Sequence, residues 1–287
     1  MTHPVVAGLR APEPEARRDA CRAAVADPAA VLLLDPLVEA LGDPDRTVSR
    51  AASDAIARIG GRQPETLRAL RGALHGDSPA KRWGAAFTLA RVTPPEPGWL
   101  PAVVEAMGSP DGDVRWAATR LLVDIARLDP GTGPVVLGLA RGADQPAVRR
   151  MATFALRDLA PDDPATTAAL LDNSRSPDAG LRRAAFTALA ALCEPTRAVW
   201  DRLAESLASE RDPGVRALAA HGAGELAART REGLPRSVRA LLEGLSSQSP
   251  SGVRRAAAAA LQRARDPHPA PGAGAPESDQ SHGEERR

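Results

Sequence analysis

The sequence predicts an all-α solenoid of about eight stacked two-helix repeats. Three observations lead to this prediction: a composition of helix-forming residues, a step of about 33 residues that recurs along the chain, and a polar turn inside each copy. Apolar residues make up 43% of the chain, yet aromatic residues make up only 2% and tyrosine is absent. Most of the apolar residues are alanine and leucine, which form helices readily, whereas a β-rich domain would need β-branched and aromatic residues.

A triplet with basic character recurs at nearly constant spacing, as in Val114, Arg115 and Trp116. Its second position falls at residues 17, 49, 82, 115, 149, 182, 216 and 254, so that successive steps are 32 to 38 residues. Seven residues after that position stands leucine or isoleucine in six copies and alanine in the other two. Three residues after it, alanine stands in every copy: Ala20, Ala52, Ala85, Ala118, Ala152, Ala185, Ala219 and Ala257. These positions share one face of a helix, and a small side chain there lets neighbouring helices approach closely.

A turn rich in Asp, Pro, Ser and Gly precedes these helices, for example around Asp111 and Asp212. Acidic residues in such turns cap the following helix and interact favourably with its positive end. Another apolar helix precedes each turn, and several of these begin with proline, whose missing N–H is not needed in a first turn. We expect these first helices of the repeats at residues 64–74, 100–107, 134–140, 164–171, 199–208 and 235–245.

The Asp-Pro turn followed by Val-Arg, a spaced Ala and a Leu resembles HEAT-like repeats, particularly the short variety found in phycobilin-lyase-type proteins. Residues 111–118 and 212–216 carry this signature best. The resemblance implies a superhelical stack whose second helices line the concave face. We therefore expect residues 1–265 to form one solenoid. Residues 266–287 are rich in Pro, Gly, Ser and charge, and we expect a disordered tail there because they cannot bury enough apolar surface.

Two positions of each second helix, those of Trp116 and Arg120 and their equivalents in the other repeats, form two columns along the stack. We expect both columns to face outward into the groove on the concave face. If Val114 faces the core, Trp116 and Arg120 lie on the opposite side at ~100° per residue. The chain has only seven aromatic residues, and four of them fall in these columns in consecutive repeats. Tryptophans at ~8–10 Å on neighbouring helices and flanked by arginine are typical of a binding hot spot. The alternative is that they cover gaps between helices. The predicted contact residues are Trp83, Phe87, Trp116, Arg120, Arg150, Phe154 and Arg183.

The arginines at the second position of the triplet, among them Arg82, Arg115 and Arg216, form what we call the second arginine column. We give this column a structural interpretation. In HEAT repeats the matching arginine pairs with the Asp of the turn, and Asp212 precedes Arg216 by four residues. Trp99 opens a first helix, where an apolar residue commonly clamps the helix entry. We interpret both features as parts of the scaffold.

No set of residues in the sequence requires a chemical reaction. The five histidines are scattered, which disfavours a zinc or iron site, and no phosphate-binding loop or nucleophile elbow is present. We therefore predict no catalytic residue, no metal and no cofactor, and the sequence favours a binding protein over an enzyme.

The function that the sequence favours is a protein-interaction scaffold that holds an acidic partner or peptide in the groove of repeats three to six. An alternative is a DNA-binding protein that resembles the HEAT-like alkylation-repair glycosylases, and another is a lyase-type protein acting on a bilin-like chromophore. The net charge of +1 argues against nucleic acid and anionic membranes. No run of 18 apolar residues occurs, and both cysteines lie in helical runs, so we expect a reduced cytoplasmic protein with no membrane contact.

Overall fold

The computed structural model describes residues 3–60, 62–159, 163–192, 194–230, 232–248 and 250–265. Over these residues the chain forms α-helices and short 3-10 helices, with no strand. The expected disordered tail, 266–287, lies outside the described residues, as does Cys193. The helices are α1(Pro4–Leu9), α2(Pro14–Ala24), η1(Ala30–Leu33), α3(Leu34–Ala40), α4(Arg46–Gly60), α5(Pro64–Ala73), α6(Pro79–Val92), η2(Pro97–Trp99), α7(Leu100–Met107), α8(Gly112–Leu128), η3(Pro130–Thr132), α9(Gly133–Gly142), α10(Pro146–Leu159), α11(Pro164–Asn173), α12(Ala179–Leu189), α13(Arg197–Ser209), α14(Pro213–Arg229), α15(Arg236–Gln248) and α16(Ser251–Arg263).

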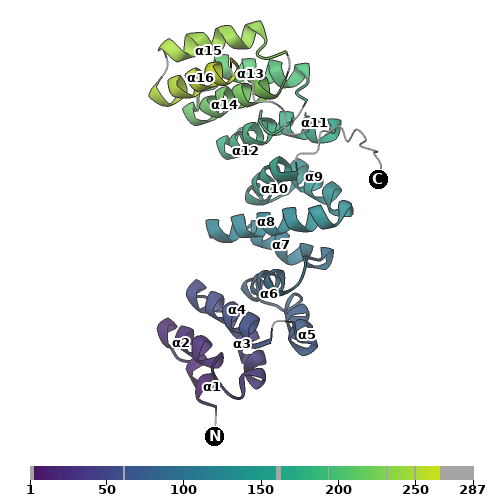
Figure 1. Ribbon diagram of the computed structural model, residues 1–287, viewed down its shortest axis with the longest axis vertical. Coiled ribbons are helices and arrows are strands. Elements are labelled where there is room, and N and C mark those ends of the chain that lie inside the picture. Colours follow the sequence, from purple (N-terminus) through teal and green to yellow (C-terminus); the bar gives the residue numbers. More distant parts are fainter. Residues whose placement is uncertain are drawn as a thin grey trace, which may run out of the picture. The chain divides into compact units, whose positions relative to one another are not determined.

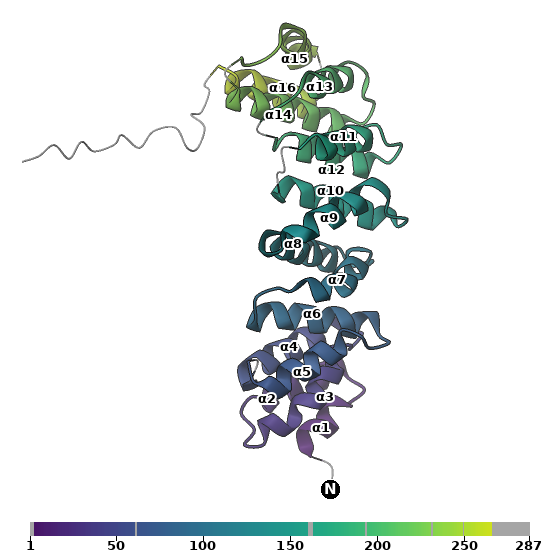
Figure 2. The same ribbon diagram turned by 90° about the vertical axis from the view of Figure 1, so that its right-hand side faces the viewer.

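Successive α-helices pack in pairs, from α1 with α2 to α15 with α16, and the pairs are the expected eight repeats of the described chain (Figure 1). The predicted all-α solenoid is therefore confirmed. The chain divides into two compact units, Met1–Leu189 and Ala190–Arg287, so that the first holds repeats one to six and the second holds repeats seven and eight. Within each unit the helices form successive layers (Figure 2). That residues 1–265 act as one solenoid domain stays a prediction.

The second helices of the first unit form a continuous row, in which α2, α4, α6, α8, α10 and α12 each contact the next. The predicted alanine column lies inside this row and is buried in every repeat, from Ala20 to Ala257. Ala118 illustrates the reason, because its methyl group is fully buried in α8 and a larger side chain would hold the neighbouring helices apart. In the second unit, α14 and α16 pack in the same way.

The helix starts follow the predicted capping chemistry. The carboxylate of Asp111 accepts hydrogen bonds from the backbone N–H groups of Asp113 and Val114 at the start of α8. The Asp212 carboxylate accepts from Val215 at the start of α14 in the same way. Seven of the described α-helices begin with proline: α1, α2, α5, α6, α10, α11 and α14.

The second arginine column is structural, as expected, but its partners differ from the expected turn aspartates. Arg115 donates to the backbone carbonyls of Ser109 and Pro110 at 2.7 and 2.9 Å, so that it satisfies the carbonyl groups that follow the preceding helix. Arg216 similarly donates to the carbonyls of Leu207 and Ala208. The Asp111 and Asp212 carboxylates instead accept N–H groups at the starts of their own helices.

Three arginines of this column also reach a side chain of the next repeat. Their pairs are Arg17 with Asp43, Arg82 with Glu105 and Arg149 with Asn173. Arg17 binds Asp43 through two nitrogen atoms at 2.7 and 3.0 Å, a bidentate geometry that fixes both groups. These contacts link consecutive repeats of the first unit.

A glycine permits the close approach of α6 to the end of α3. A Cβ atom on Gly84 would lie 2.7 Å from the Leu41 carbonyl oxygen and 2.8 Å from the Leu41 Cβ. No side chain fits at these distances without a shift of the backbone, so glycine allows α6 to pack closely on the end of α3. Gly84 lies next to Trp83, and both residues line the cleft described below.

Candidate binding surface

Three second helices, α4, α6 and α8, surround a cleft of about 370 Å³ in the first unit. Trp83 and Phe87 line it from α6, where they are one helical turn apart on the same face. Their ring centroids are 5.7 Å apart with the planes tilted by 44°, and both side chains are half-buried. The small residues Ser49 and Ser53 of α4 complete the adjoining wall. The arrangement is a concave apolar surface with polar groups at its edge, which suits a bound side chain.

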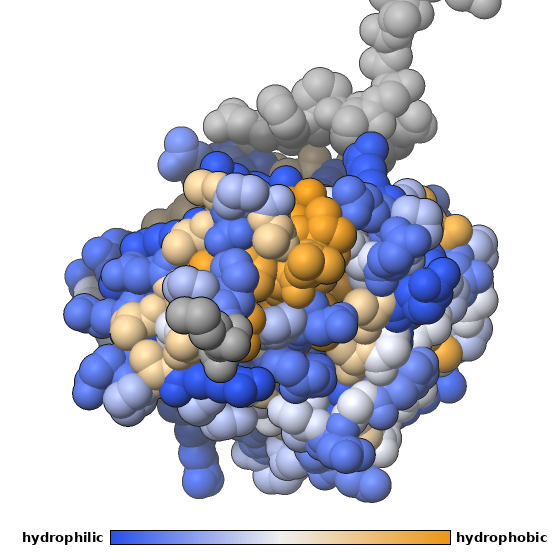
Figure 3. Space-filling model, turned by 90° about the horizontal axis from the view of Figure 1, so that it is seen from below, coloured by the Kyte–Doolittle hydropathy of each residue, from blue (hydrophilic) through white to orange (hydrophobic). Residues whose placement is uncertain are grey.

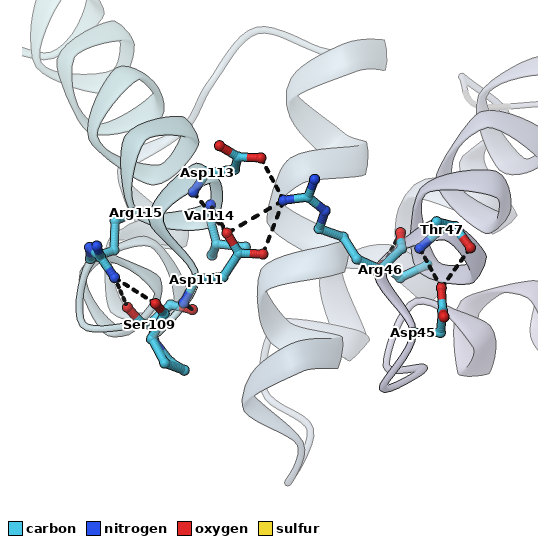
Figure 4. A network of polar contacts seen from close by, with 10 residues as sticks. Asp45, Arg46, Thr47, Ser109, Asp111, Asp113, Val114 and Arg115 are labelled. Atoms are coloured by element: carbon cyan, nitrogen blue, oxygen red, sulfur yellow. Dashed lines mark hydrogen bonds and ion pairs between the residues drawn. The ribbon is translucent and has the colours of Figure 1, made fainter.

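A charged bridge crosses the rim of this cleft. Arg46, at the start of α4, donates to the Asp111 carboxylate at 3.1 Å and to the Asp113 carboxylate at 2.6 Å (Figure 4). These aspartates stand at the start of α8, two repeats later in the chain. Asp111 therefore has two roles, because the same carboxylate also caps α8. The bridge links the rims formed by α4 and α8.

The hydrogen bonds that Asp111 accepts depress the pKa of its carboxyl group. The backbone N–H of Asp113 makes the largest contribution, and the Arg46 guanidinium adds to it. We expect Asp111 to titrate below the ordinary aspartate pKa of about 3.9. Because the pKa is lower in the folded state, the stabilisation is complete above about pH 4 and is lost as the pH falls through the folded-state pKa. Arg46→Ala should raise the pKa of Asp111 yet leave it below the ordinary value, because the Asp113 N–H remains.

A pH titration of the carboxyl carbon of Asp111 by NMR measures this effect. Arg71→Ala removes a different exposed ion pair, Arg71 with Glu96, and should leave the titration of Asp111 unchanged. An Asp111 pKa in Arg46→Ala equal to that in the wild-type protein would contradict the contribution of the bridge.

The remaining predicted aromatic residues form a second pair. Trp116 of α8 contacts Phe154 of α10, with ring centroids 4.9 Å apart and planes tilted by 48°. Trp116 is 43% exposed, and Phe154 is half-buried. Trp83 therefore has a phenylalanine of its own helix as ring partner, whereas Trp116 has a phenylalanine of the next repeat. Trp116 and Phe154 do not line the cleft of Trp83 and Phe87.

The predicted arginines are spread over three helices. Arg120 of α8 is exposed, and it forms no ion pair or side-chain hydrogen bond with any described residue. Arg150 of α10 likewise has no such partner in the described part of the chain, and its guanidinium lies against the backbone of Gly180 at the start of α12. Arg183 of α12 is exposed. None of the three lines the cleft.

Sequence reasoning missed the contribution of repeat two to the cleft. Arg46 and Arg50 of α4 line it, together with Asp111 and Asp113 of α8. Arg50 occupies the same outward column as Trp83 and Trp116, so the repeat pattern could have predicted that Arg50 contributes to this surface. No pattern in the sequence indicated the ion pair of Arg46, because its partners Asp111 and Asp113 are 65 and 67 residues away.

The described surface seen from the α1 side is mainly hydrophilic with one concentrated hydrophobic area (Figure 3). Among the described residues, no three His, Cys, Asp or Glu side chains gather in a way that could hold a metal ion. No helix in the described ranges is both long and apolar enough to cross a membrane.

Comparison with known proteins identifies the repeat. A family model described as HEAT repeats matches residues 2–82, 72–157 and 133–224. The chain belongs to the HEAT-repeat family. The matches include α4, α6 and α8, so the cleft of this HEAT-repeat protein is built from family repeats. No curated protein sequence matches the chain.

Solved structures share the fold of this HEAT-repeat protein. YIBA from Escherichia coli aligns with a TM-score of 0.59 at 16% identity, covering 91% of this chain and 91% of YIBA. Importin beta aligns with a TM-score of 0.60 at 16% identity, covering 91% of this chain and 40% of importin beta. A Kap121p mutant aligns with a TM-score of 0.55 at 16% identity, covering 91% of this chain and 33% of Kap121p. At these identities the likeness establishes the α-solenoid fold alone.

Proposed function

We propose that this HEAT-repeat protein is an interaction scaffold that holds a peptide segment of a partner protein in the cleft between α4, α6 and α8. The observation that carries the proposal is the half-buried pair of Trp83 and Phe87 in a cleft of about 370 Å³. An aromatic surface enclosed by polar groups is the arrangement found at the energetic centre of protein interfaces. Repeat solenoids commonly bind partners on such extended surfaces.

We propose that the partner continues from the cleft across α8, α10 and α12. Trp116 supports this extension, because a tryptophan that is 43% exposed offers a large contact area. Arg50, Arg120 and Arg150 have no ion-pair partner in the described part of the chain, so they can pair with a ligand at no cost to the fold. These arginines favour a partner of acidic character. The proposed contact set is Trp83, Phe87, Trp116, Arg120, Arg150, Phe154 and Arg183.

We also propose a cytoplasmic location. Cys21 is a free, fully buried thiol, and a reducing compartment keeps such a thiol unoxidised.

The first test is the effect of Trp83→Ala on peptide binding. Peptides that bind the full chain are selected from a random displayed library, and their affinities are then measured by calorimetry. We expect Trp83→Ala to weaken them by a factor of ~30 or more, because truncation of a central aromatic hot spot typically costs about 2 kcal/mol or more. Trp83 is only half-buried, so the helix content should remain unchanged.

Trp200→Ala is the matched control, because Trp200 is also a half-buried tryptophan but lies on α13 in the second unit. The selected peptides should bind this variant as they bind the wild type. Unchanged affinity in Trp83→Ala would show that the cleft is not the site. The double variant Trp116→Ala with Arg150→Ala tests the extension separately, and it should weaken long acidic peptides more than short ones. Tight binding to duplex DNA that falls steeply with salt would instead favour a nucleic-acid partner.

A further inference from the structure

A second cavity of about 400 Å³ lies in the first unit, between α2 and α4. Four arginines line it, two from each helix: Arg18 and Arg22 from α2, and Arg50 and Arg58 from α4. Arg18 and Arg22 are one helical turn apart, and Arg50 and Arg58 are two turns apart, so each pair projects from a single helix face. Two arginine faces therefore converge on one cavity.

The positive charge of this cavity is poorly compensated. The one acidic residue in its lining is Asp54, and the Asp54 carboxylate already accepts from Arg91 at 2.6 Å. Arg50 and Arg58 have no ion pair or side-chain hydrogen bond with any described residue. Arg22 pairs with the Asp19 carboxylate at 3.1 Å, so four arginines stand beside two carboxylates, Asp19 and Asp54. A local excess of positive charge remains, although the whole chain carries a net charge of only +1.

Arg18 contributes charge to the wall of the cavity. Its Nε atom is buried and has no hydrogen-bond partner among the described residues. The Asp19 carboxylate lies 3.8 Å from this atom, which is an ion-pair distance but beyond hydrogen-bond distance. The Arg18 side chain is 28% exposed, so its guanidinium charge still adds to the charge of the cavity.

The remaining lining consists mainly of small side chains. Ala51 and Ala55 present only methyl groups, and the Thr47 hydroxyl donates to the Asp45 carboxylate at 2.6 Å. Burial raises the pKa of the Cys21 thiol to about 11, and the nearby charge of Asp43 contributes, so the thiol stays protonated at neutral pH. The chemistry of this cavity is therefore binding.

We propose that the cavity between α2 and α4 is a binding site for a phosphomonoester group. Such a group carries a charge of about −1.5 to −2 at neutral pH and three acceptor oxygens, which match several guanidinium forks that converge from two sides. A carboxylate carries a single charge and engages one fork, so it uses this arrangement less fully. The proposal does not depend on peptide binding in the neighbouring cleft, although Arg50 lines both cavities.

The test uses the full chain and four probes in calorimetric titrations at low ionic strength. The probes are an alanine-rich peptide with one phosphoserine, the same peptide with serine, O-phospho-L-serine and inorganic phosphate. We expect the phosphorylated peptide to bind at least about tenfold more tightly than its serine form, because hydrogen bonds to charged groups are the stronger class. If O-phospho-L-serine binds as tightly as the phosphorylated peptide, a free phosphomonoester is sufficient for binding. If the phosphorylated peptide binds more tightly than the small probes, the ligand is a phosphorylated segment of a protein.

The variant Arg50→Gln with Arg58→Gln should lose at least about tenfold in affinity for every phosphorylated probe. Both side chains are exposed and have no partner to lose, so the fold should be retained. The control Arg68→Gln with Arg236→Gln removes the same net charge at two exposed positions that do not line the cavity, and it should bind like the wild type. Trp83→Ala should also retain phosphate binding, which separates this site from the peptide cleft.

Three results would overturn the proposal. One is equal affinity for the phosphorylated and unphosphorylated peptides. Another is wild-type affinity in the Arg50→Gln/Arg58→Gln variant. The last is tighter binding of duplex DNA than of any phosphomonoester, since that would indicate a site for phosphodiesters.

Discussion

Replacing Trp99 by alanine should lower the free energy of unfolding by about 3–5 kcal/mol. Trp99 ends η2, directly before α7, and is only 1% exposed, which makes it the largest fully buried side chain among the described residues. Its removal leaves a cavity at the start of a first helix, where rigid neighbouring repeats can collapse only partly. Chemical denaturation followed by circular dichroism measures the loss.

Trp99→Phe should cost clearly less than Trp99→Ala. The indole Nε1–H of Trp99 is buried without an acceptor among the described residues, so phenylalanine removes an unsatisfied donor while keeping much of the apolar volume. Trp116→Ala is the matched control, because it removes another tryptophan from the same unit. It should lower the free energy of unfolding far less, because Trp116 is 43% exposed. Equal losses for Trp99→Ala and Trp116→Ala would contradict the assigned burial.

Leu122→Ala should destabilise the first unit by about 2–5 kcal/mol. Leu122 occupies the predicted apolar column of the second helices, and in α8 it is 0% exposed. The loss combines the transfer free energy of the removed methyl and methylene groups with the cavity left between α8 and its neighbours.

Leu128→Ala is the matched control on the same helix. Leu128 ends α8 and is 61% exposed, so the same substitution should change the free energy of unfolding by less than about 0.5 kcal/mol. The comparison is made by urea denaturation with both variants at the same protein concentration. A loss of similar size at both positions would show that the repeat register is misassigned.

The repeat register was readable from the sequence because it depends on local periodicity. The alanine column and the apolar column recur within single helices, and all of their members in the described chain are buried. The first helix predicted at residues 100–107 is α7(Leu100–Met107). Capping followed the same logic, since Asp111 acts on N–H groups only two and three residues away.

The arginine column shows where local reasoning ends. The sequence suggested pairing with acidic residues four or five positions earlier, but Arg82 pairs with Glu105 and Arg17 with Asp43. These partners lie 23 and 26 residues away, in the next repeat. Which side chains meet across two repeats depends on the rotation between them, and periodicity within one repeat contains no information on that rotation.

The aromatic residues show the same division. Their outward column was readable, but Trp83 pairs with Phe87 on its own helix, whereas Trp116 pairs with Phe154 of the following repeat. Phe87 stands four residues after Trp83, whereas Arg120 stands four residues after Trp116, so Trp116 has no ring partner one turn later on its own helix. That Trp116 contacts Phe154 depends on the packing of α8 against α10.

The sequence by itself determined the all-α solenoid, the eight repeats and the face of each second helix, because these follow from residues within one turn or one repeat of each other. Only the tertiary structure decided that α4, α6 and α8 enclose a cleft, that Arg46 reaches Asp111 across it, and that four arginines converge between α2 and α4. Those features depend on close packing between helices of different repeats, where the volume of a single side chain decides which groups come into contact.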